Sequence, residues 1–409
     1  MEKKIKIAIV FGSRSVEHEV SIVTAMQVFE NIDREKYDVV PVYIDKQGKW
    51  LIDDKLSKLE NFSAEGGPAF GWRNSPKDIK APEYFFEASP SVKTLTPRSA
   101  LKFFKKIKAD IYFPVIHGTY GEDGTIQGMF EMANVPYVGS GVTGSAVGMD
   151  KIIQKAVFKE AGLPIVKYVW FSKSEWQNNK VKIIEKIEKN LGYPVFVKPA
   201  NLGSSIAINK AVGLKELELA IEVASNFDQR IIIEEGKEGI IEINCSVIGN
   251  YELNVSVCEQ PIKGGQMLSY EDKYLKGGKN SGLPALPGRQ AGGRQGMAGL
   301  SRLVPAPISE ELTIKIQEMA KMAFKAIDAS GVSRVDFLVD EKDNNIWINE
   351  INTLPGSLSF YLWEKSGINF SELIDRLASL GFERYKEQQE LTYSYDSDLI
   401  SKTSSGTKS

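Results

Sequence analysis

The sequence predicts an α/β fold, and three observations support this class. Apolar, strand-like runs at residues 5–11 and 39–44 flank a helical pattern at residues 16–32, which is the order that opens a parallel sheet. A polar segment with three glycines, residues 117–124, directly follows another apolar run, as is typical of ligand-binding loops at the carboxyl edge of such a sheet. The C-terminal part contains an alternating strand–turn–strand pattern at residues 334–352.

Length, composition and charge exclude several classes of protein. The 409 residues are enough for two to four domains or lobes, and a formal net charge of −2 gives no electrostatic argument for nucleic acid or a membrane as partner. The apolar run near the start is too short for a signal peptide, and no run approaches a transmembrane length. Two cysteines, Cys245 and Cys258, make no disulfide framework, so we expect buried thiols and a cytoplasmic protein.

The first strand leads into a turn and a helix. The turn, GSRSVE, lacks the second and third glycines of a dinucleotide-binding fingerprint. Glu17 lies at the start of the helix, where its charge either complements the helix dipole or serves a ligand, and the residues alone leave both interpretations open. A further strand is expected near residues 49–51, and residues 46–100 are otherwise expected to be irregular.

The chain contains two histidines, and both lie beside glycine-containing strand ends. His18 follows the first turn, and His117 follows a strand expected at residues 109–116. A helix is expected through Met132, with a short strand and turn at residues 136–141. A single histidine is usually packed or solvated, so this placement suggests a ligand site without establishing one.

The middle of the chain contains a candidate phosphate-binding loop. Asp150 is expected to cap a helix at residues 151–161. Farther along, a strand at residues 195–198 ends in Lys198, and the loop PANLGSS separates it from a returning strand expected at residues 206–208. Such a loop can offer N–H groups and hydroxyls to phosphate oxygens, although a plain hairpin turn also explains it.

The C-terminal half is predicted to contain strands at residues 230–234, 242–248 and 253–257 and helices at residues 310–329 and 370–384. Residues 276–302 are rich in glycine, carry only basic charges and lack periodicity, which is typical of a mobile lid or of disorder. Ser309 is expected to cap the first of these helices, and Gly331 to follow it. Residues 389–409 are polar and are expected to form a disordered tail.

The strand–turn–strand pattern near the C-terminus predicts a magnesium site. If the register continues unchanged from a pair between Asp340 and Ile346, Asp336 lies opposite Glu350 and Arg334 opposite Asn352. Opposed carboxylates repel unless a cation lies between them, and hard oxygen donors suit Mg²⁺, which shares its shell with substrate phosphates. A solvated acidic hairpin is the alternative. On this register one side of the second strand carries Ile346, Ile348, Glu350 and Asn352.

Together these features indicate an enzyme that uses a nucleoside triphosphate without a Walker loop. Six motifs then carry a family resemblance: FGSRSVEHEVS, HGTYGEDGTIQGMFE, YVGSGVTGSAVGMDK, FVKPANLGSS, YEDKY and RVDF…NEINTLPG. With these motifs the chain resembles the D-alanine–D-alanine ligases of the ATP-grasp superfamily over about residues 4–388. The last motif is that of the superfamily, and the first together with YEDKY narrows the resemblance to the ligase family.

The resemblance implies an ATP-grasp fold preceded by a Rossmann-like N-terminal α/β domain. Residues 1–139 would be the substrate-binding N-terminal domain and residues 140–232 the central ATP-grasp subdomain. Residues 233–388 would be the C-terminal subdomain, with a mobile lid at residues 270–302. The family resemblance also implies a homodimer formed through the N-terminal lobe.

The implied reaction is an ATP-dependent ligation of two D-alanines for peptidoglycan precursors. ATP would phosphorylate the carboxylate of the first D-alanine, the amine of the second would attack the D-alanyl phosphate, and ADP and phosphate would leave. Two Mg²⁺ ions, which Mn²⁺ can replace, would be held by Asp336, Glu350 and Asn352.

The resemblance also implies roles for residues outside the metal site. Nucleotide-binding roles would fall to Lys151, Lys198 and Lys273 on the phosphates, Glu234 and Glu235 near the adenine, and Glu242 on the ribose. Catalytic roles would fall to Arg334 at the transferring phosphoryl group, Gly356 at the tetrahedral intermediate, and a hydrogen-bonded triad of Glu17, Ser204 and Tyr274. Substrate-binding roles would fall to Glu17 on the ammonium of the first D-alanine, His117 beside it, and Ser357.

Two departures from the family pattern leave questions open. The loop after Gly356 is several residues shorter than in familiar members, so the second amino acid is uncertain and D-serine is the alternative acceptor. Tyr274 is typical of dipeptide ligases and favours an amine nucleophile. Residues 282–295, GLPALPGRQAGGRQ, resemble an insertion.

Three other functions explain the sequence less well. A nicotinamide-dependent oxidoreductase lacks its glycine fingerprint here and leaves the hairpin unexplained. Another ATP-grasp carboxylate–amine ligase would be expected to lack the Glu17 motif and Tyr274. A non-catalytic nucleotide-binding regulator is disfavoured because every catalytic position carries a competent residue.

Overall fold

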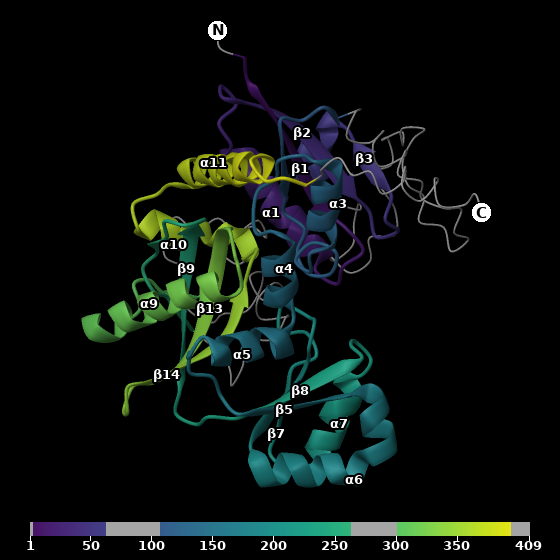
Figure 1. Cartoon of the computed structure of the whole chain (residues 1–409), viewed down its shortest axis with the longest axis vertical. Helices are drawn as coiled ribbons and strands as arrows, with labels where there is room; N and C mark the ends of the chain where they lie inside the picture. Colours follow the sequence, from purple (N-terminus) through teal and green to yellow (C-terminus); the bar gives the residue numbers. More distant parts are fainter. Residues whose placement is uncertain (1–2, 63–106, 263–300, 394–409) are drawn as a thin grey trace, which may run out of the picture.

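The computed structural model describes residues 3–62, 107–262 and 301–393. Three groups of elements follow one another along the long axis of the molecule (Figure 1). One end holds the N-terminal sheet, the middle holds the sheet that contains β9 and β13, and the other end holds the sheet that contains β5 and β8. Within the described ranges, every helix is too short or too polar to pass through a bilayer.

The N-terminal sheet is a parallel α/β sheet, as the sequence predicts. Its strands have the order β3 (Trp50–Ile52), β2 (Tyr37–Ile44), β1 (Ile5–Gly12) and β4 (Ile111–Pro114). β1 is parallel to both β2 and β4, and only the short β3 is antiparallel. Parallel strands need crossover helices, and α1 (His18–Asn31) and α3 (Thr125–Ala133) are the helices beside this sheet. Two short 3₁₀ turns, η1 (Asp54–Ser57) and η2 (Leu59–Asn61), follow β3.

Of the short strand and turn expected at residues 136–141, the strand is reduced to one residue pair. Only a single parallel bridge forms there, between Tyr112 and Tyr137. Gly139 has a positive φ of 98°, which ends the extended conformation after two residues. The chain then enters α4 (Val142–Met149) and α5 (Lys151–Glu160), and the side chain of Asp150 caps α5 as predicted.

The sheet at the end opposite the N-terminal one, here called the central sheet because its strands come from the middle of the sequence, is antiparallel and carries its helices on one face. Its order is β5 (Tyr168–Ser172), β8 (Arg230–Glu235), β6 (Val195–Pro199) and β7 (Asn209–Ala211). Alternate apolar residues of β5, β6 and β8 pack against α6 (Lys173–Asn190) and α7 (Leu214–Ala224). The opposite face carries Lys198 and Glu234, and it is directed towards the C-terminal sheet.

The returning strand predicted at residues 206–208 is wrong. Pairing with β6 begins only at Asn209. Ser204, Ser205 and Ala207 have φ angles between 54° and 58°, a left-handed conformation that no strand adopts. The Gly-Ser loop is therefore longer than a hairpin turn.

The C-terminal sheet is antiparallel and is covered on one face by α9 (Glu310–Ala326). Its order is β10 (Asn254–Val255), β9 (Ile241–Gly249), β13 (Gly331–Asp340) and β14 (Asn345–Asn352). A separate two-stranded ribbon joins β11 (Gln260–Pro261) to β12 (Arg302–Leu303).

The predicted N-cap of α9 is confirmed, and its predicted end is not. The side chain of Ser309 accepts a hydrogen bond from the N–H of Leu312. The helix ends at Ala326, and Asp328, with a φ of 59°, is the first residue after it in the left-handed conformation. Gly331 instead opens β13, where its backbone lies so close to Gly139 that a Cβ would stand 2.9 Å from the Cα of that residue.

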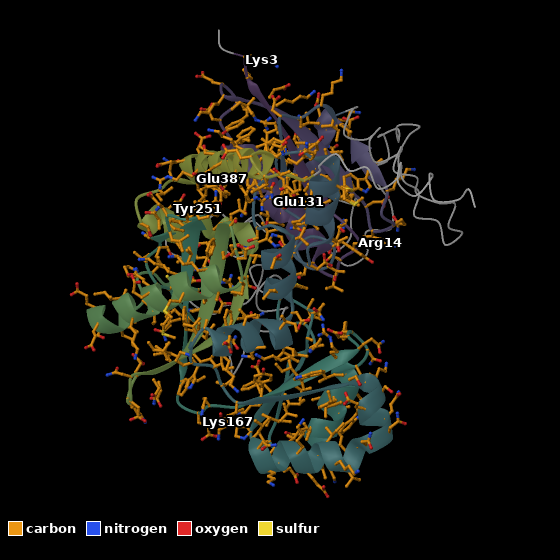
Figure 2. The ribbon with its side chains drawn as sticks, viewed as in Figure 1. Lys3, Arg14, Glu131, Lys167, Tyr251 and Glu387 are labelled. Carbon is orange, nitrogen blue, oxygen red and sulfur yellow. The ribbon has the colours of Figure 1, made fainter. Side chains whose placement is uncertain are left out.

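The chain returns to the N-terminal lobe in its last helix. The loop expected at residues 356–358 is the 3₁₀ turn η5 (Gly356–Ser359), followed by α10 (Phe360–Lys365), which the sequence did not predict. The last helix, α11 (Phe370–Gln389), is longer than predicted and shares a core with β1 and α1 through residues such as Ile9, Phe29 and Leu377. Near its end Glu387 accepts a hydrogen bond from Tyr251 at 2.9 Å (Figure 2).

Several predictions lie outside the described residues. They concern Lys273, Tyr274, residues 282–295, nearly all of the lid at residues 270–302, and most of both the irregular stretch at residues 46–100 and the tail. Both cysteines are described and are buried free thiols, as expected.

Candidate active site

A cavity of about 390 Å³ lies between the central and the C-terminal sheets. Its volume is within the range of small-molecule sites. Strand alternation explains its lining, because Val335, Phe337 and Val339 point to the core under α9 and their neighbours point to the cavity. The cavity-facing residues include Lys198 and Glu234 from the central sheet and Glu242, Asn244, Arg334, Asp336 and Leu338 from the C-terminal sheet.

The predicted pairing of Asp336 with Glu350 and of Arg334 with Asn352 is confirmed, although the predicted register is not. Asp340 pairs with Asn345, one residue earlier than expected. A β-bulge at Asn349 then restores the expected pairs, because Phe337 lies opposite Ile348 and Asp336 opposite Glu350.

Because of the bulge, the prediction that Ile346, Ile348, Glu350 and Asn352 share one side of the second strand is wrong. Without it, Glu350 and Asn352 would point to the same side as Ile348, which is fully buried in the core. With the extra residue, Ile351 turns to the core opposite Val335, and Glu350 and Asn352 turn to the cavity side.

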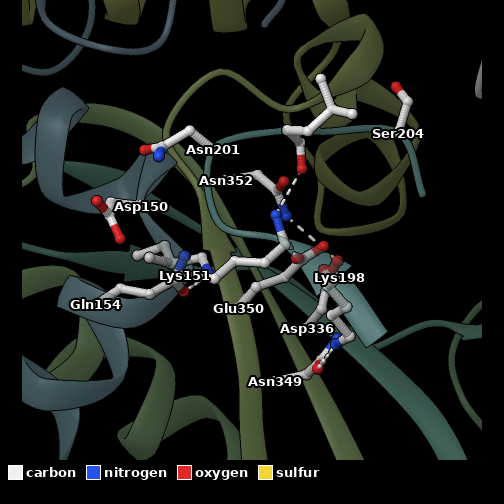
Figure 3. A network of polar contacts seen from close by, with 12 residues as sticks. Asp150, Lys151, Gln154, Lys198, Asn201, Ser204, Asp336, Asn349, Glu350 and Asn352 are labelled. Atoms are coloured by element: carbon white, nitrogen blue, oxygen red, sulfur yellow. Dashed lines mark hydrogen bonds and ion pairs between the residues drawn. The ribbon is translucent and has the colours of Figure 1, made fainter. Parts of the chain in front are cut away.

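The donor set on this face fits a hard divalent cation that keeps part of its shell for other ligands. Asn352 Nδ2 donates to Asp336 Oδ2 at 3.2 Å, and Glu350 lines the same cavity wall (Figure 3). Among the described residues no group of three or more His, Cys, Asp or Glu could hold a metal. Two carboxylates and one amide leave positions for water and phosphate oxygens, which is how Mg²⁺ is usually bound.

Arg334 is buried and held by a two-pronged ion pair. Its Nε and Nη2 donate to the two carboxylate oxygens of Asp336 at 2.6 and 2.7 Å. Burial alone would lower the pKa of Arg334, but Asp336 outweighs this effect and raises it, so the guanidinium stays charged. A fixed, planar cation beside the cavity suits a group that develops negative charge.

Lysines from two elements converge on the acidic face. Lys151, at the start of α5, lies 3.9 Å from Glu350 and donates to the carbonyl of Leu202 at 2.6 Å. Lys198, at the end of β6, donates to Glu234 at 2.6 Å and to Asn349 Oδ1 at 3.2 Å. Figure 3 shows Lys151 and Lys198 on either side of Glu350.

Glu234 lies between two buried lysines. Its carboxylate pairs with Lys198 and, at 3.1 Å, with Lys155 of α5. Burial alone would raise the pKa of Glu234, but the charges of Lys155 and Lys198 outweigh burial and lower it to about 2. The sequence predicts a contact of Glu234 with adenine, and this stays a prediction, because in the structure the carboxylate is engaged by the lysines.

The other two acids with predicted nucleotide-binding roles, Glu235 and Glu242, line the same cavity. Glu235 pairs with Lys237 at 2.7 Å, and Glu242 lines the cavity wall. Lys237 also lies 5.0 Å above the ring of Trp347. This end of the cavity is therefore polar and partly open.

A smaller cavity of about 40 Å³ adjoins the larger one, and Arg334 and Glu350 line both. Glu17, His117, Ser204 and Gly356 meet here from four separate parts of the chain. The hydroxyl of Ser204 donates to the Glu17 carboxylate, so the first motif and the Gly-Ser loop are joined as predicted.

His117 connects this cavity to the loop after Gly356. One ring nitrogen lies 2.8 Å from the hydroxyl of Thr24, and that hydroxyl also accepts the N–H of Ser357 at 3.4 Å. The other ring nitrogen lies 3.3 Å from Glu122. His18, in contrast, is packed between Ser13 and Tyr43, and burial lowers its pKa, so it serves as a neutral core residue.

The loop after Gly356 has an unusual backbone. Ser357, Leu358 and Ser359 all have φ angles of 52–53°, which side chains with a Cβ rarely adopt. Such strain occurs mainly where surrounding structure imposes it at ligand sites. The side chain of Ser357 is 2% exposed and thus packed rather than open to a large ligand.

Three candidate functional residues were not predicted from the sequence. Lys155 and Asn349 are described above, and a signal for Lys155 was available, because it lies one helical turn after Lys151 on the same face of α5. The third is Glu259, which binds Arg302 at 2.8 Å and Tyr361 at 3.0 Å on the wall of the larger cavity. No sequence spacing pointed to it.

The family comparison matches both halves of the chain. The model described as D-ala D-ala ligase N-terminus matches residues 6–140. The model described as D-ala D-ala ligase C-terminus matches residues 157–289 and 297–379.

Curated proteins and solved structures agree with these matches. The chain is 41% identical over 404 residues to the D-alanine–D-alanine ligase of Ruminiclostridium cellulolyticum, covering 97% of this chain and 100% of that one. It is 40% identical over 387 residues to that of Heliobacterium modesticaldum, covering 94% and 96%.

Two solved structures are similar along their whole length. The VanG D-Ala:D-Ser ligase of Enterococcus faecalis has a TM-score of 0.70 at 30% identity and covers 93% of this chain and 100% of that one. The D-alanine–D-alanine ligase of Coxiella burnetii has a TM-score of 0.69 at 28% identity and covers 95% and 98%. The fold, the two family matches and the identity to curated ligases agree, and the chain belongs to the D-alanine–D-alanine ligase family and is an ADP-forming ligase of the ATP-grasp type.

Proposed function

We propose that this protein joins two D-alanines at the expense of ATP, through a D-alanyl phosphate, to supply D-Ala–D-Ala for peptidoglycan precursors and cell-wall synthesis. One observation carries the proposal. Two cavities, one large enough for a nucleotide and one small, meet at a shared wall formed by Arg334 and Glu350. A phosphoryl group at that wall is within reach of both a nucleotide and an amino acid.

The nucleotide belongs in the larger cavity. As an ATP-grasp ligase the protein uses ATP and a divalent metal ion. Lys151 and Lys198 approach the acidic face as phosphate ligands, and Glu235 and Glu242 line the same cavity, where adenosine would lie. Two Mg²⁺ ions on Asp336, Glu350 and Asn352, or Mn²⁺ in their place, would neutralise charge between the phosphates.

The first D-alanine belongs in the smaller cavity. The carboxylate of Glu17 is 5% exposed and is oriented by Ser204, so it presents a fixed negative charge to an ammonium group. His117 lies on the same wall and is itself fixed by Thr24 and Glu122. Positioning of this kind supplies much of the rate acceleration in such reactions.

Arg334 and Gly356 would stabilise the charge that develops in both steps. In the first, a carboxylate oxygen of D-alanine attacks the γ-phosphorus and ADP leaves. Arg334, held by Asp336, points its charge at the transferring group. In the second, the neutral amine of the other amino acid attacks the acyl carbon, phosphate leaves, and the N–H of Gly356 would bind the oxyanion.

D-alanine is the proposed second substrate, and D-serine is the alternative. D-alanine is favoured because the curated relatives at about 40% identity are named as D-alanine–D-alanine ligases. D-serine is supported by the similarity to a D-Ala:D-Ser ligase structure and by the short loop after Gly356. The cytoplasmic location and the homodimer are further parts of this proposal.

The test is phosphate release from ATP and Mg²⁺ with D-alanine, L-alanine, or D-alanine together with D-serine or D-lactate, with products identified by mass. We expect release that depends on D-alanine and yields D-Ala–D-Ala. A mixed D-Ala–D-Ser product would favour the alternative. A folded protein that binds ATP but releases no phosphate in response to any D-amino acid would refute the proposal.

A further inference from the structure

Helix α5 contacts three consecutive residues of the bulged strand β14. The Nζ of Lys155 donates to the carbonyl of Asn349 at 3.2 Å, and Lys151 lies 3.9 Å from Glu350. The N–H of Ile351 donates to Gln154 Oε1 at 3.1 Å. β14 is the edge strand of its sheet, so these contacts come from outside the ladder. Figure 3 shows Lys151 and Gln154 on one side of Glu350, and Asn349 beside Lys198 on the other.

These contacts fix the bulge, at which the side chains of β14 switch from one face of the sheet to the other. A bulge leaves its extra residue unpaired in the ladder. Here the bulged residue, Asn349, bonds instead to two lysines, through its carbonyl to Lys155 and through its side chain to Lys198. The orientation of Glu350 and Asn352 towards the cavity depends on this bulge, because a strand without it would turn both into the core.

Burial of the Lys155 charge costs free energy, and Lys155 lines neither of the two cavities. Its side chain is 0% exposed, and its charge is balanced by Glu234 at 3.1 Å. A buried ion pair is often no more stable than apolar residues of the same size, so stability alone gives little reason for a lysine at this position. A hydrogen bond from a charged donor to the bulge carbonyl is a contact that no apolar residue could make.

We propose that Lys155 is a positioning residue for the divalent metal site, acting through the carbonyl of Asn349 to fix the bulge that turns Glu350 and Asn352 towards the cavity. The inference rests on the proposed use of these residues as metal ligands. Residues that orient metal ligands from behind typically change metal affinity about 10- to 100-fold when they are removed. The same size of loss is expected here.

The test measures metal binding without turnover. Binding of Mn²⁺ to the full-length protein in the presence of ADP is followed by the loss of the free-Mn²⁺ electron paramagnetic resonance signal. Lys155→Met removes the donor at nearly constant volume. Lys159→Met, an exposed lysine one turn farther along the same helix, is the matched control. Thermal unfolding and ADP affinity without metal are recorded for each variant.

A second variant covers the case in which Lys155→Met leaves Glu234 too poorly balanced to fold. The double change Lys155→Met with Glu234→Gln removes both charges of that pair, which costs less than removing one partner, and Lys198 keeps its hydrogen bond to Asn349 Oδ1. We expect Mn²⁺ binding about 10- to 100-fold weaker in both Lys155 variants, with metal-free ADP affinity retained in Lys155→Met and the control unchanged.

Three outcomes separate the inference from the proposed function. Wild-type Mn²⁺ affinity in a folded Lys155→Met or double variant would overturn the inference. Equal losses of Mn²⁺ and of metal-free ADP binding in Lys155→Met would indicate a general structural role and would also overturn it. A wild-type protein that binds Mn²⁺ and ADP but fails to ligate D-alanine would refute the proposed function and leave the positioning role standing.

Discussion

Glu234 is a buried carboxylate whose charge is balanced by two lysines. It is 2% exposed and lies between Lys155 and Lys198, which lower its pKa from the ordinary value of 4.5 to about 2. A carboxyl with a lowered folded-state pKa stabilises the protein above its unfolded pKa, and that stability is lost as pH falls from about 4.5 towards about 2.

We therefore predict that Glu234→Gln is strongly destabilising in a pH-dependent way. Two buried lysines would lose their partner, at a cost of about 3–5 kcal/mol at pH 7. The difference from wild type in urea unfolding should shrink by about 1 kcal/mol at pH 4, because part of the wild-type advantage is already lost there. Glu235→Gln, whose lysine partner is at the surface, is the control and should change stability by less than about 1 kcal/mol. A pH-independent difference would contradict this account of Glu234.

The predicted metal ligands show what the sequence can and cannot predict at the scale of residues. Asp336, Glu350 and Asn352 were predicted from residue type and approximate spacing, and their pairing is confirmed. The pairing was reached through two errors that cancel, a shift of one residue at the turn and an unforeseen bulge. Contacts such as that of Lys155 with Asn349 join residues 194 apart in the chain, and no local pattern encodes them.

At the scale of elements, the Gly-Ser loop is fitted closely against the start of α1. A Cβ on Gly203 would lie 2.7 Å from Glu17 Oε2, and the backbone there is not in the left-handed region. The alanine variant should therefore fold, because only the end of a flexible side chain has to move. That side chain is the proposed ligand of the first D-alanine.

Gly203→Ala is accordingly expected to raise KM for D-alanine about tenfold, equivalent to about 1.4 kcal/mol, with a smaller change in kcat. Steady-state kinetics with saturating ATP measure both constants. Gly128→Ala, in α3, is the control, because no atom lies within 4 Å of its added Cβ. An unchanged KM in the Gly203 variant would show that Glu17 is not fixed by this contact for binding.

Some boundaries of helices and strands are set by a local sequence signal such as a capping residue, and others are not. Asp150 and Ser309 were predicted as caps from sequence and are confirmed. Helix α6 was missed although its start carries a capping box between Ser172 and Glu175, so that signal was available. The late start of β7 was not predictable in this way, because the left-handed residues before it are serines and an alanine rather than glycines.

At the scale of the whole molecule, the ribbon of β11 and β12 fixes the two ends of the segment between residues 262 and 301. The N–H of Ile262 donates to the carbonyl of Ser301 at 2.9 Å, and Arg302 is held by Glu259 and stacked 3.7 Å from the ring of Tyr361. These contacts do not depend on the length of the segment between them. The C-terminal family match is interrupted between residues 289 and 297, within the insertion-like stretch.

We predict that deleting residues 283–294 leaves turnover intact or improves it. Shortening a long loop changes its closure entropy by well under about 1 kcal/mol. The comparison is kcat and KM for ATP in wild type and variant, with unfolding temperature as the check on folding. A variant that folds and binds ATP but does not turn over would contradict the prediction.

The arrangement of whole lobes was the hardest feature to predict. The strands of each sheet have local signals, but the meeting of the two cavities at Arg334 and Glu350 depends on how the three sheets pack. Helix α11 illustrates this point, because it follows the C-terminal sheet in sequence and completes the core of the N-terminal one. The family resemblance predicted that these parts of the chain form one active site, and the hydrophobic and polar patterns alone did not.

The most direct test of the central claim is the fate of a carboxylate oxygen. D-alanine labelled with ¹⁸O in its carboxyl group is supplied with ATP and Mg²⁺, and the released phosphate is analysed by mass. If the carboxylate attacks the γ-phosphorus and the second amine then displaces phosphate, each phosphate carries one ¹⁸O. Phosphate without ¹⁸O would mean that water, not the amino acid, received the phosphoryl group, and would contradict the mechanism.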